Sequence, residues 1–184
     1  MPKEFSAPRL DVTAFAEEGA TLAGHPPLSA FARLLDEAQG RGAEREVAWS
    51  ARGELRNPRH LRPETWLHLQ AQARLSLTCQ RCLAPVDVDV AVDRSFRFVE
   101  DEATAAAEDD EAEEDLLALS RSFDLPALVE DELLMALPLV PRHDACPEPL
   151  PLPAAVAGEE GDGPGGGRPN PFAVLQKLKS GGQG

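Results

Sequence analysis

The chain has 184 residues, enough for one well-packed domain, and its aromatic content is only 5% with no Tyr, so an aliphatic core is expected. The net charge is −14, and its distribution is uneven: residues 1–98 hold 13 Lys/Arg and 13 Asp/Glu, whereas residues 99–184 hold 5 and 19. An acidic surface repels phosphates, which argues against DNA binding and against a broad face for naked RNA. It favours basic partners, although acidic surface also simply keeps proteins soluble.

The N-terminus and the cysteines indicate the compartment. The first six residues lack the apolar region of a signal peptide. The longest apolar run, residues 133–140, is interrupted by Pro138 and is too short to cross a bilayer. Three cysteines without an export signal are typical of a reducing environment. We therefore expect a cytoplasmic protein that does not enter a membrane.

The first half of the chain predicts one helix and a sheet. Apolar residues at helical spacing predict a short helix over residues 29–39, which ends before Gly40. Alternating apolar and polar residues predict a half-buried strand over 46–55. The same alternation continues through 67–78 and 86–98, two runs separated by seven residues. Two long alternating runs so close together predict an antiparallel hairpin with one solvated face.

The acidic part of the chain predicts a break in this order. Residues 100–115 hold ten carboxylates and no basic residue, which predicts a disordered connector. A strand is expected within 116–123. Asp124 then caps a helix that ends near Leu137, because Pro138 stops it.

The C-terminal part is expected to be a tether and a helix. Pro, Gly and acidic residues dominate residues 147–167, a composition typical of a flexible tether. Residues 168–184 are expected to form a docking helix and tail, with one apolar face. The helix docks either on its own domain or on a partner, and we favour the partner because the tether frees it. Its expected contact residues are Asn170, Pro171, Phe172 and Leu175.

Together these elements predict an α+β fold. We expect a single domain over residues 1–146, with the acidic connector inside it. Its scaffold is an antiparallel sheet or partly closed barrel flanked by helices, followed by the tethered C-terminal helix.

Two pairs of metal-ligand residues share one spacing. Cys79 and Cys82 lie in the turn of the predicted hairpin, and His143 and Cys146 follow the predicted helix. A turn with two such cysteines is how zinc knuckles present two thiolates to a tetrahedral metal. The four residues are therefore a candidate zinc site. The alternative is reduced cysteines without a metal, because spacing does not establish geometry.

The acidic run Glu130, Asp131 and Glu132 lies in the predicted helix. At about 100° per residue, Glu132 falls in the middle of the apolar face, whereas Leu134 falls among positions expected to be solvated. A carboxylate in that place requires an arginine or backbone donors. Two interpretations follow: a core helix with one buried ion pair, or a face that meets a partner protein.

No acid–base constellation is evident in the sequence. His25, His60 and His68 have no acidic or nucleophilic neighbour that suggests a triad, and no glycine-rich phosphate loop follows a strand. Carboxylate pairs abound only in residues 100–115, where no rigid scaffold is expected to hold them. The sequence therefore predicts a protein that is not an enzyme.

Three separated motifs carry a resemblance to a known family. They are the turn 79–83 followed by Pro85, the segment 128–144, and the segment 168–175. In order and context they resemble the YceD family of large ribosomal RNA subunit accumulation proteins. The resemblance extends over roughly residues 45–179. Some family members have more cysteines near the position of Cys146, where this chain has one Cys and one His.

The resemblance implies a non-catalytic factor in ribosome biogenesis that supports the synthesis, processing or stability of large-subunit ribosomal RNA. The expected partner is a large-subunit precursor or a basic ribosomal protein, with indirect contact to the RNA. The alternative is a zinc-stabilised binding module that chaperones one basic large-subunit ribosomal protein.

Overall fold

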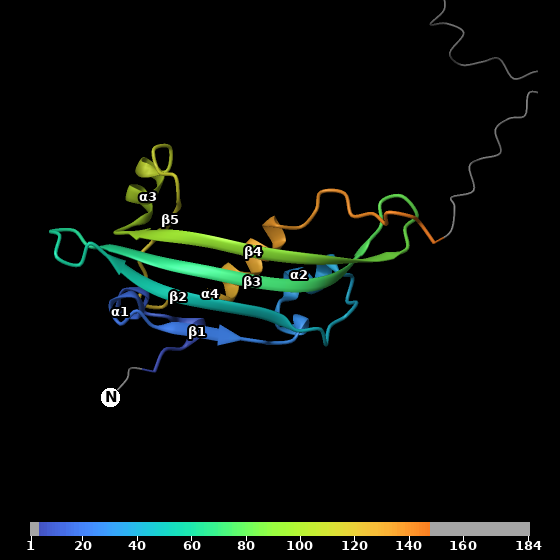
Figure 1. Cartoon of the computed structure of the whole chain (residues 1–184), viewed down its shortest axis with the longest axis horizontal. Helices are drawn as coiled ribbons and strands as arrows, with labels where there is room; N and C mark the ends of the chain where they lie inside the picture. The colour runs from blue at the N-terminus through green and yellow to red at the C-terminus, as the bar shows by residue number, and fades with distance from the viewer. Residues whose placement is uncertain (1–3, 148–184) are drawn as a thin grey trace, which may run out of the picture. The chain divides into compact units, whose positions relative to one another are not determined.

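Two fifteen-residue strands form the centre of the computed structural model, which describes residues 4–147 (Figure 1). They belong to an open five-stranded sheet of order β1-β2-β3-β4-β5, in which only the pair β4 and β5 is parallel. The α+β prediction is confirmed, with an open sheet rather than a barrel. The strands are β1 (Thr21–Gly24), β2 (Val47–Arg56), β3 (Glu64–Thr78), β4 (Pro85–Val99) and β5 (Asp115–Ala118).

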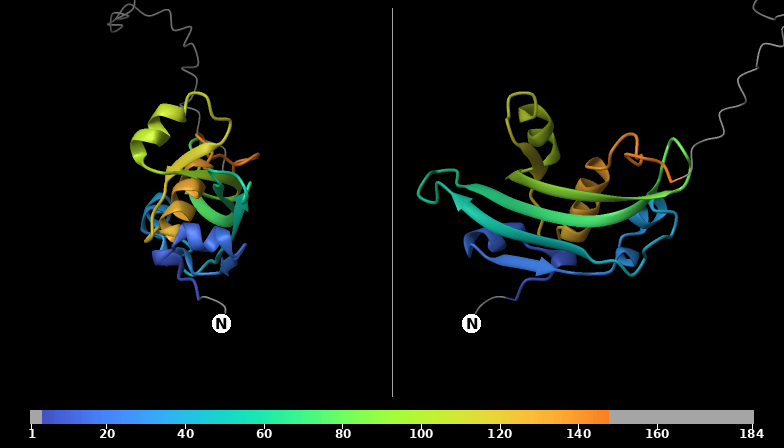
Figure 2. Two further views of the ribbon diagram at one scale, coloured as in Figure 1. Left: turned by 90° about the vertical axis from the view of Figure 1, so that its left-hand side faces the viewer. Right: turned by 45° about the vertical axis from the view of Figure 1, so that its right-hand side comes forward.

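In the described part of the chain, four α-helices flank the sheet. α4 crosses one face of it with α1 and α2 on the same side, and α3 lies beside β5 at the sheet edge (Figure 2). The helices are α1 (Val12–Glu17), α2 (Ala32–Glu37), α3 (Glu102–Glu108) and α4 (Leu125–Met135), with two 3-10 helices, η1 (Ala7–Arg9) and η2 (Leu28–Ala30). Among residues 4–147, no helix has the length and apolar character that a membrane span needs.

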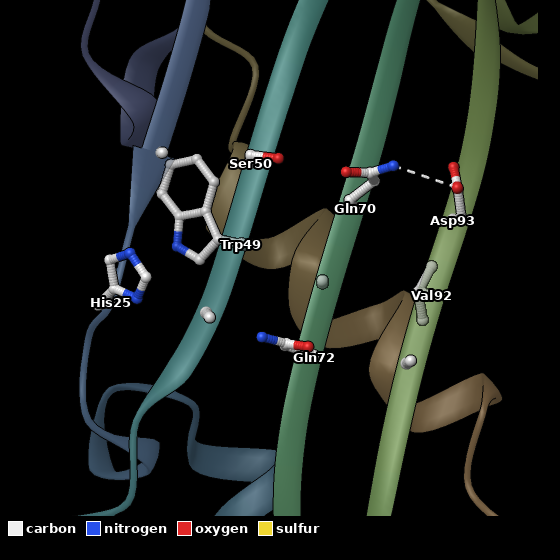
Figure 3. A pocket seen from close by; sticks show the side chains of 11 residues that line it. His25, Trp49, Ser50, Gln70, Gln72, Val92 and Asp93 are labelled. Carbon is white, nitrogen blue, oxygen red and sulfur yellow. Dashed lines mark hydrogen bonds between the residues drawn. The ribbon is translucent and has the colours of Figure 1, made fainter.

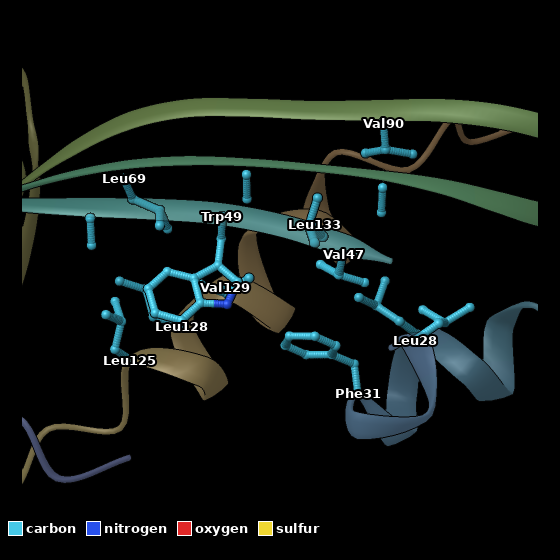
Figure 4. Close-up of a cluster of buried hydrophobic side chains, with 14 of the residues drawn as sticks. Leu28, Phe31, Val47, Trp49, Leu69, Val90, Leu125, Leu128, Val129 and Leu133 are labelled. Carbon is cyan, nitrogen blue, oxygen red and sulfur yellow. The ribbon is translucent and has the colours of Figure 1, made fainter. Parts of the chain in front are cut away.

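The core lies between these helices and the inward face of the hairpin. Along β3 the leucines and alanines are buried while the residues between them point to the open face, as the alternation predicts. Figure 4 shows Trp49 and Leu69 from the sheet beside Val129 and Leu133 of α4 and Phe31, which precedes α2. Most of the fully buried large side chains are Leu or Val, so the core is largely aliphatic, as expected.

Helix α4 begins as the sequence predicts. The side chain of Asp124 accepts a hydrogen bond from the backbone N–H of Ala127 at 3.1 Å, which caps the helix. Glu132 is buried on the inner face with 8% of its surface exposed, so the helical-phase prediction is confirmed. The prediction for Leu134 was wrong. It is half-buried, because it packs against the core cluster that includes Leu77 of β3.

The acidic residues 100–115 differ from the predicted disordered connector, since they contain α3. Asp101 caps this helix, and Arg97 of β4 pairs with Glu108 at 3.2 Å and with Glu114 at 2.5 Å. The prediction of disorder considers only the charges within residues 100–115. The compensating arginine lies outside it, on the strand that the segment returns to.

The sequence also missed the N-terminal elements α1 and β1. Helix α1 packs closely on β2, because Gly53 of β2 has no side chain that would keep the helix at a distance. A Cβ at Gly53 would come within 2.6 Å of the backbone oxygen of Phe15. Glycine is therefore required by this close approach rather than by a turn.

The predicted C-terminal helix and most of its tether, residues 148–184, lie outside the described residues. The tether, the helix and the domain boundaries built on them therefore stay predictions.

Candidate metal centre

The turn between β3 and β4 (residues 79–84) presents two sulfur atoms. The backbone N–H of Cys79 donates to the oxygen of Ala84, and the N–H of Leu83 donates to the oxygen of Cys79, both at 2.9 Å. Leu83 adopts a positive φ of 62°, which tightens the turn. Cys79 is fully buried as a result, and Cys82 is half-buried.

The other two ligands come from the arm, which we define as residues 138–147 after α4. The backbone N–H of Gln80 donates to the oxygen of Pro141 at 2.8 Å, so the arm is attached to the turn next to the cysteines. His143 and Cys146 are thereby brought to the turn, although Cys146 is 67 residues away from Cys79.

The four predicted ligands converge. One ligand atom from each of Cys79, Cys82, His143 and Cys146 lies within 4.8 Å of the others. The sulfur atoms of Cys79 and Cys146 are 4.0 Å apart, close to the roughly 3.8 Å between two thiolates on one tetrahedral zinc. The distance from Cys82 Sγ to His143 Nδ1 is 3.5 Å. The structure therefore brings together the whole set that the sequence nominated, in a geometry compatible with a metal site.

The imidazole of His143 is oriented by its second nitrogen. Nε2 lies 3.0 Å from the backbone oxygen of Pro85, an acceptor, so Nε2 carries the proton. In the neutral imidazole, Nδ1 is then the acceptor nitrogen, and it faces the sulfur of Cys82. Metal-binding histidines in proteins are commonly held in this way, by a hydrogen bond from the nitrogen that does not bind the metal.

The environment favours one thiolate and opposes the next. Burial raises the pKa of Cys79, but hydrogen bonds from the backbone of Cys82, His143 and Arg81 outweigh it and lower the pKa to about 5. For Cys82, a hydrogen bond from the backbone of Ala84 lowers the pKa, but burial and the neighbouring Cys146 and Cys79 sulfurs raise it overall. Clustered thiolates repel one another, and a bound cation is what removes that repulsion.

This donor set suits one kind of metal chemistry. Three thiolates and one imidazole are ligands that zinc prefers, in the tetrahedral number that structural sites use. Four protein ligands leave no open position for a substrate or water. A metal held there would therefore act as a cross-link that fastens the arm to the β3–β4 turn.

The acidic residues of α4 that were predicted to contact a partner make contacts within the fold. Glu130 Oε1 accepts from the backbone N–H of Arg33 at 2.7 Å and of Leu34 at 3.3 Å, so it caps α2, which has no cap of its own. The Arg33 guanidinium also pairs with Glu130 and with Asp131. Asp131 remains about half exposed.

Glu132 has the arginine partner that its burial requires. Arg94 Nε lies 3.9 Å from Glu132 Oε2, and Arg94 also pairs with Asp115 of β5. Burial raises the pKa of Glu132, and attraction to Arg94 only partly offsets this, while Asp115 and Asp131 add to it. The remaining predicted contact residues, Asn170, Pro171, Phe172 and Leu175, lie outside the described residues.

The structure adds a cluster that the sequence did not reveal. His68 Nε2 lies 2.5 Å from Glu54 Oε2, and His68 Nδ1 lies 2.8 Å from Ser95 Oγ. The expectation that His68 has no acidic or nucleophilic neighbour was therefore wrong. Strand register produces both contacts, since Ser95 of β4 pairs with His68, and Glu54 lies diagonally from it, two residues beyond its β2 pairing partner Arg52. Hydrogen bonds from Arg56 and then from His68 lower the pKa of Glu54.

A pocket of about 420 Å³ lies on the open face of the sheet, opposite α4 (Figure 3). The small side chains of Ala23, Ala48 and Ala91 leave a hollow between larger neighbours. Within it, Gln70 donates to Asp93 at 3.2 Å. The hollow results from small residues rather than from converging ligand groups, so the Cys/His cluster remains the stronger candidate site.

One family model matches the part of the chain that contains the Cys/His cluster. The model of the family described as large ribosomal RNA subunit accumulation protein YceD matches residues 67–179, which include all four ligands of the cluster. The chain belongs to the YceD family. No solved structure matches it.

Proposed function

We propose that this YceD-family protein is a non-catalytic factor that supports the synthesis, processing or stability of large-subunit ribosomal RNA. The family match over residues 67–179 carries the proposal, because the family is described by that RNA's accumulation. The closed character of the Cys/His cluster supports a structural rather than a catalytic role for it.

We propose further that the cluster binds zinc and that the metal builds the binding surface. The arm that follows α4 contains Leu139, which is fully exposed, and Val140, and the turn contains Leu83, also largely exposed. Leu139 lines a groove together with Gln80 of the turn, and exposed apolar groups gathered on one surface suit contact with a partner. A zinc ion that holds the arm on the turn would fix these side chains in place.

The partner we propose is a large-subunit precursor particle, bound through its proteins and touching its RNA only indirectly. The net charge of −14 supports this choice, since ribosomal proteins are basic and RNA is not. Asp131 and the C-terminal residues Asn170, Pro171, Phe172 and Leu175 are proposed contacts. The same charge also favours the second candidate, a chaperone for one free basic ribosomal protein.

Sedimentation of a tagged chain separates these functions. Extract is fractionated on a gradient with and without ribonuclease, and co-migrating RNA and proteins are identified. A precursor-bound factor co-migrates with large-subunit precursors and shifts to lighter fractions after ribonuclease. A chaperone keeps one ribosomal protein in light fractions under both conditions. A tagged chain that associates with neither would contradict both proposals.

A further inference from the structure

The side chain of Arg81 reaches from the turn to the arm across the Cys/His cluster. Its Nε–H donates to Cys146 Sγ at 3.0 Å. Its Nη2 donates to the backbone oxygens of His143 at 2.9 Å and Asp144 at 3.3 Å. One residue of the turn thus contacts a ligand sulfur and the backbone that carries the other arm ligand.

The contact between Arg81 and the cluster also has an electrostatic effect. Three thiolates, a neutral imidazole and Zn²⁺ together carry a charge of about −1, which leaves excess electron density on the sulfurs. A guanidinium beside one sulfur neutralises that charge, and an N–H···S hydrogen bond makes that particular thiolate less nucleophilic. The effect is confined to Cys146, because this is the ligand sulfur that receives the Arg81 hydrogen bond.

We propose that Arg81 is a positioning residue of the metal centre, which clamps the arm onto the turn and shields the Cys146 thiolate from electrophiles and from loss of the metal. The inference rests on the proposed zinc site. The planar guanidinium is suited to this role, since it spreads its donors over a sulfur and two carbonyls. A lysine would supply the charge but not the spread of donors.

Three variants of the full chain test the clamp. Arg81→Gln removes the charge and most donors, Arg81→Lys keeps only the charge, and Arg142→Gln is the control. Arg142 is an exposed arginine of the same arm, so its loss changes the net charge equally. Each protein is purified with zinc, and its zinc is measured before the rates are compared.

Two readouts are used: release of zinc to an excess of the chromogenic chelator 4-(2-pyridylazo)resorcinol, and alkylation of each cysteine by iodoacetamide, mapped by peptide mass spectrometry. Arg81→Gln should release zinc about 10- to 100-fold faster than the unaltered chain, the usual cost of losing a partner of a metal ligand. Cys146 should become alkylated before Cys79 and Cys82. Arg81→Lys should be intermediate, and Arg142→Gln should behave as the unaltered chain.

The outcomes separate the clamp from the metal site. Zinc-loaded unaltered chain together with unchanged release and unchanged Cys146 alkylation in Arg81→Gln overturns the clamp and leaves the zinc site standing. Unaltered chain that takes up no zinc overturns both. If Arg81→Gln does not fold, Arg81→Lys decides, because it keeps the charge: Cys146 alkylated no faster than in the unaltered chain then contradicts the clamp.

Discussion

The two ends of the β3–β4 hairpin are held in different ways. At the closed end, the turn and the arm meet at four converging ligands, with Cys79 fully buried (Figure 1). At the open end, α3 and β5 are held on β4 by Arg97 and Arg94, which pair with the more exposed Glu108 and Asp115 and with the half-buried Glu114. With zinc bound, the first attachment would consist of short directional bonds to one point, whereas the second consists of ion pairs that water and salt reach at least in part.

The difference predicts a difference in robustness. Exposed ion pairs contribute about 0–1 kcal/mol each and weaken with salt. A metal with four protein ligands stabilises the folded state by its binding free energy. This stabilisation is lost only when the metal is removed. The closed end should therefore respond to chelators and not to salt, and the open end should do the reverse.

The largest expected effect is at the closed end. Cys79→Ser should abolish zinc binding and lower the free energy of unfolding by about 3 kcal/mol, the stabilisation from a ligand held at about a hundred times its dissociation constant. Thermal melting with zinc analysis checks this. Gln80→Ser is the matched control, since Gln80 lies in the same turn and is not a ligand. An unchanged melting temperature after chelation of the unaltered chain would remove the contrast between the two ends.

A smaller effect is expected at the open end. Arg97→Gln leaves Glu108 and Glu114 without their cation, so α3 should loosen at a cost of about 1–2 kcal/mol. Hydrogen exchange of residues 102–108 measures the loosening, and added salt should produce part of it in the unaltered chain. Arg121→Gln, an exposed arginine outside these pairs, serves as control. If α3 of Arg97→Gln exchanges as slowly as α3 of the unaltered chain, the ion pairs do not hold this helix.

The attachment of α2 to α4 combines a helix cap and an ion pair in one side chain. Glu130→Ala removes the acceptor of two backbone N–H groups and an ion pair, and should cost about 1–2 kcal/mol. Asp131→Ala, its neighbour, removes only an exposed pair and should cost less than about 1 kcal/mol. Denaturant unfolding of both variants compares cap with charge. Equal costs would mean that Glu130 acts as a surface charge alone.

The smallest effect concerns Glu132 and depends on pH. Its pKa in the folded protein is raised, chiefly by burial, so the native state binds the proton more tightly than the unfolded chain does. Stability should therefore fall as the pH rises from the unfolded value of about 4.3 through the raised folded value. Glu132→Leu should lack this component and change stability by less than about 1 kcal/mol at pH 7, because Arg94 keeps Asp115. Urea unfolding from pH 4 to 7 measures it, and identical profiles would contradict the assignment.

Local pattern was sufficient for much of the fold. Alternation along 67–78 and 86–98 and the cap at Asp124 depend on residues near in sequence, and the hairpin and α4 follow from them. Composition alone predicts disorder for the acidic run, because the balancing charge of Arg97 belongs to another element. The helical phase of α4 placed Glu132 correctly but not Leu134, whose partial burial depends on packing against the core.

The site divides in the same way. The repeated spacing identifies Cys79, Cys82, His143 and Cys146 as candidate metal ligands. Only the folded arm brings the two pairs together. The contact of Arg81 with Cys146 depends on the direction of one side chain, which no spacing encodes. The cluster of His68 with Glu54 follows from strand register, and the alternation of polar residues does not specify which of them meet.

Native mass spectrometry of the purified full chain tests whether the Cys/His cluster binds zinc. We expect one zinc ion per chain, with a mass that shows the loss of thiol protons, and we expect Cys79→Ser and Cys146→Ser each to abolish this species. Unaltered chain that is purified with added zinc and retains only its apo mass would contradict this expectation.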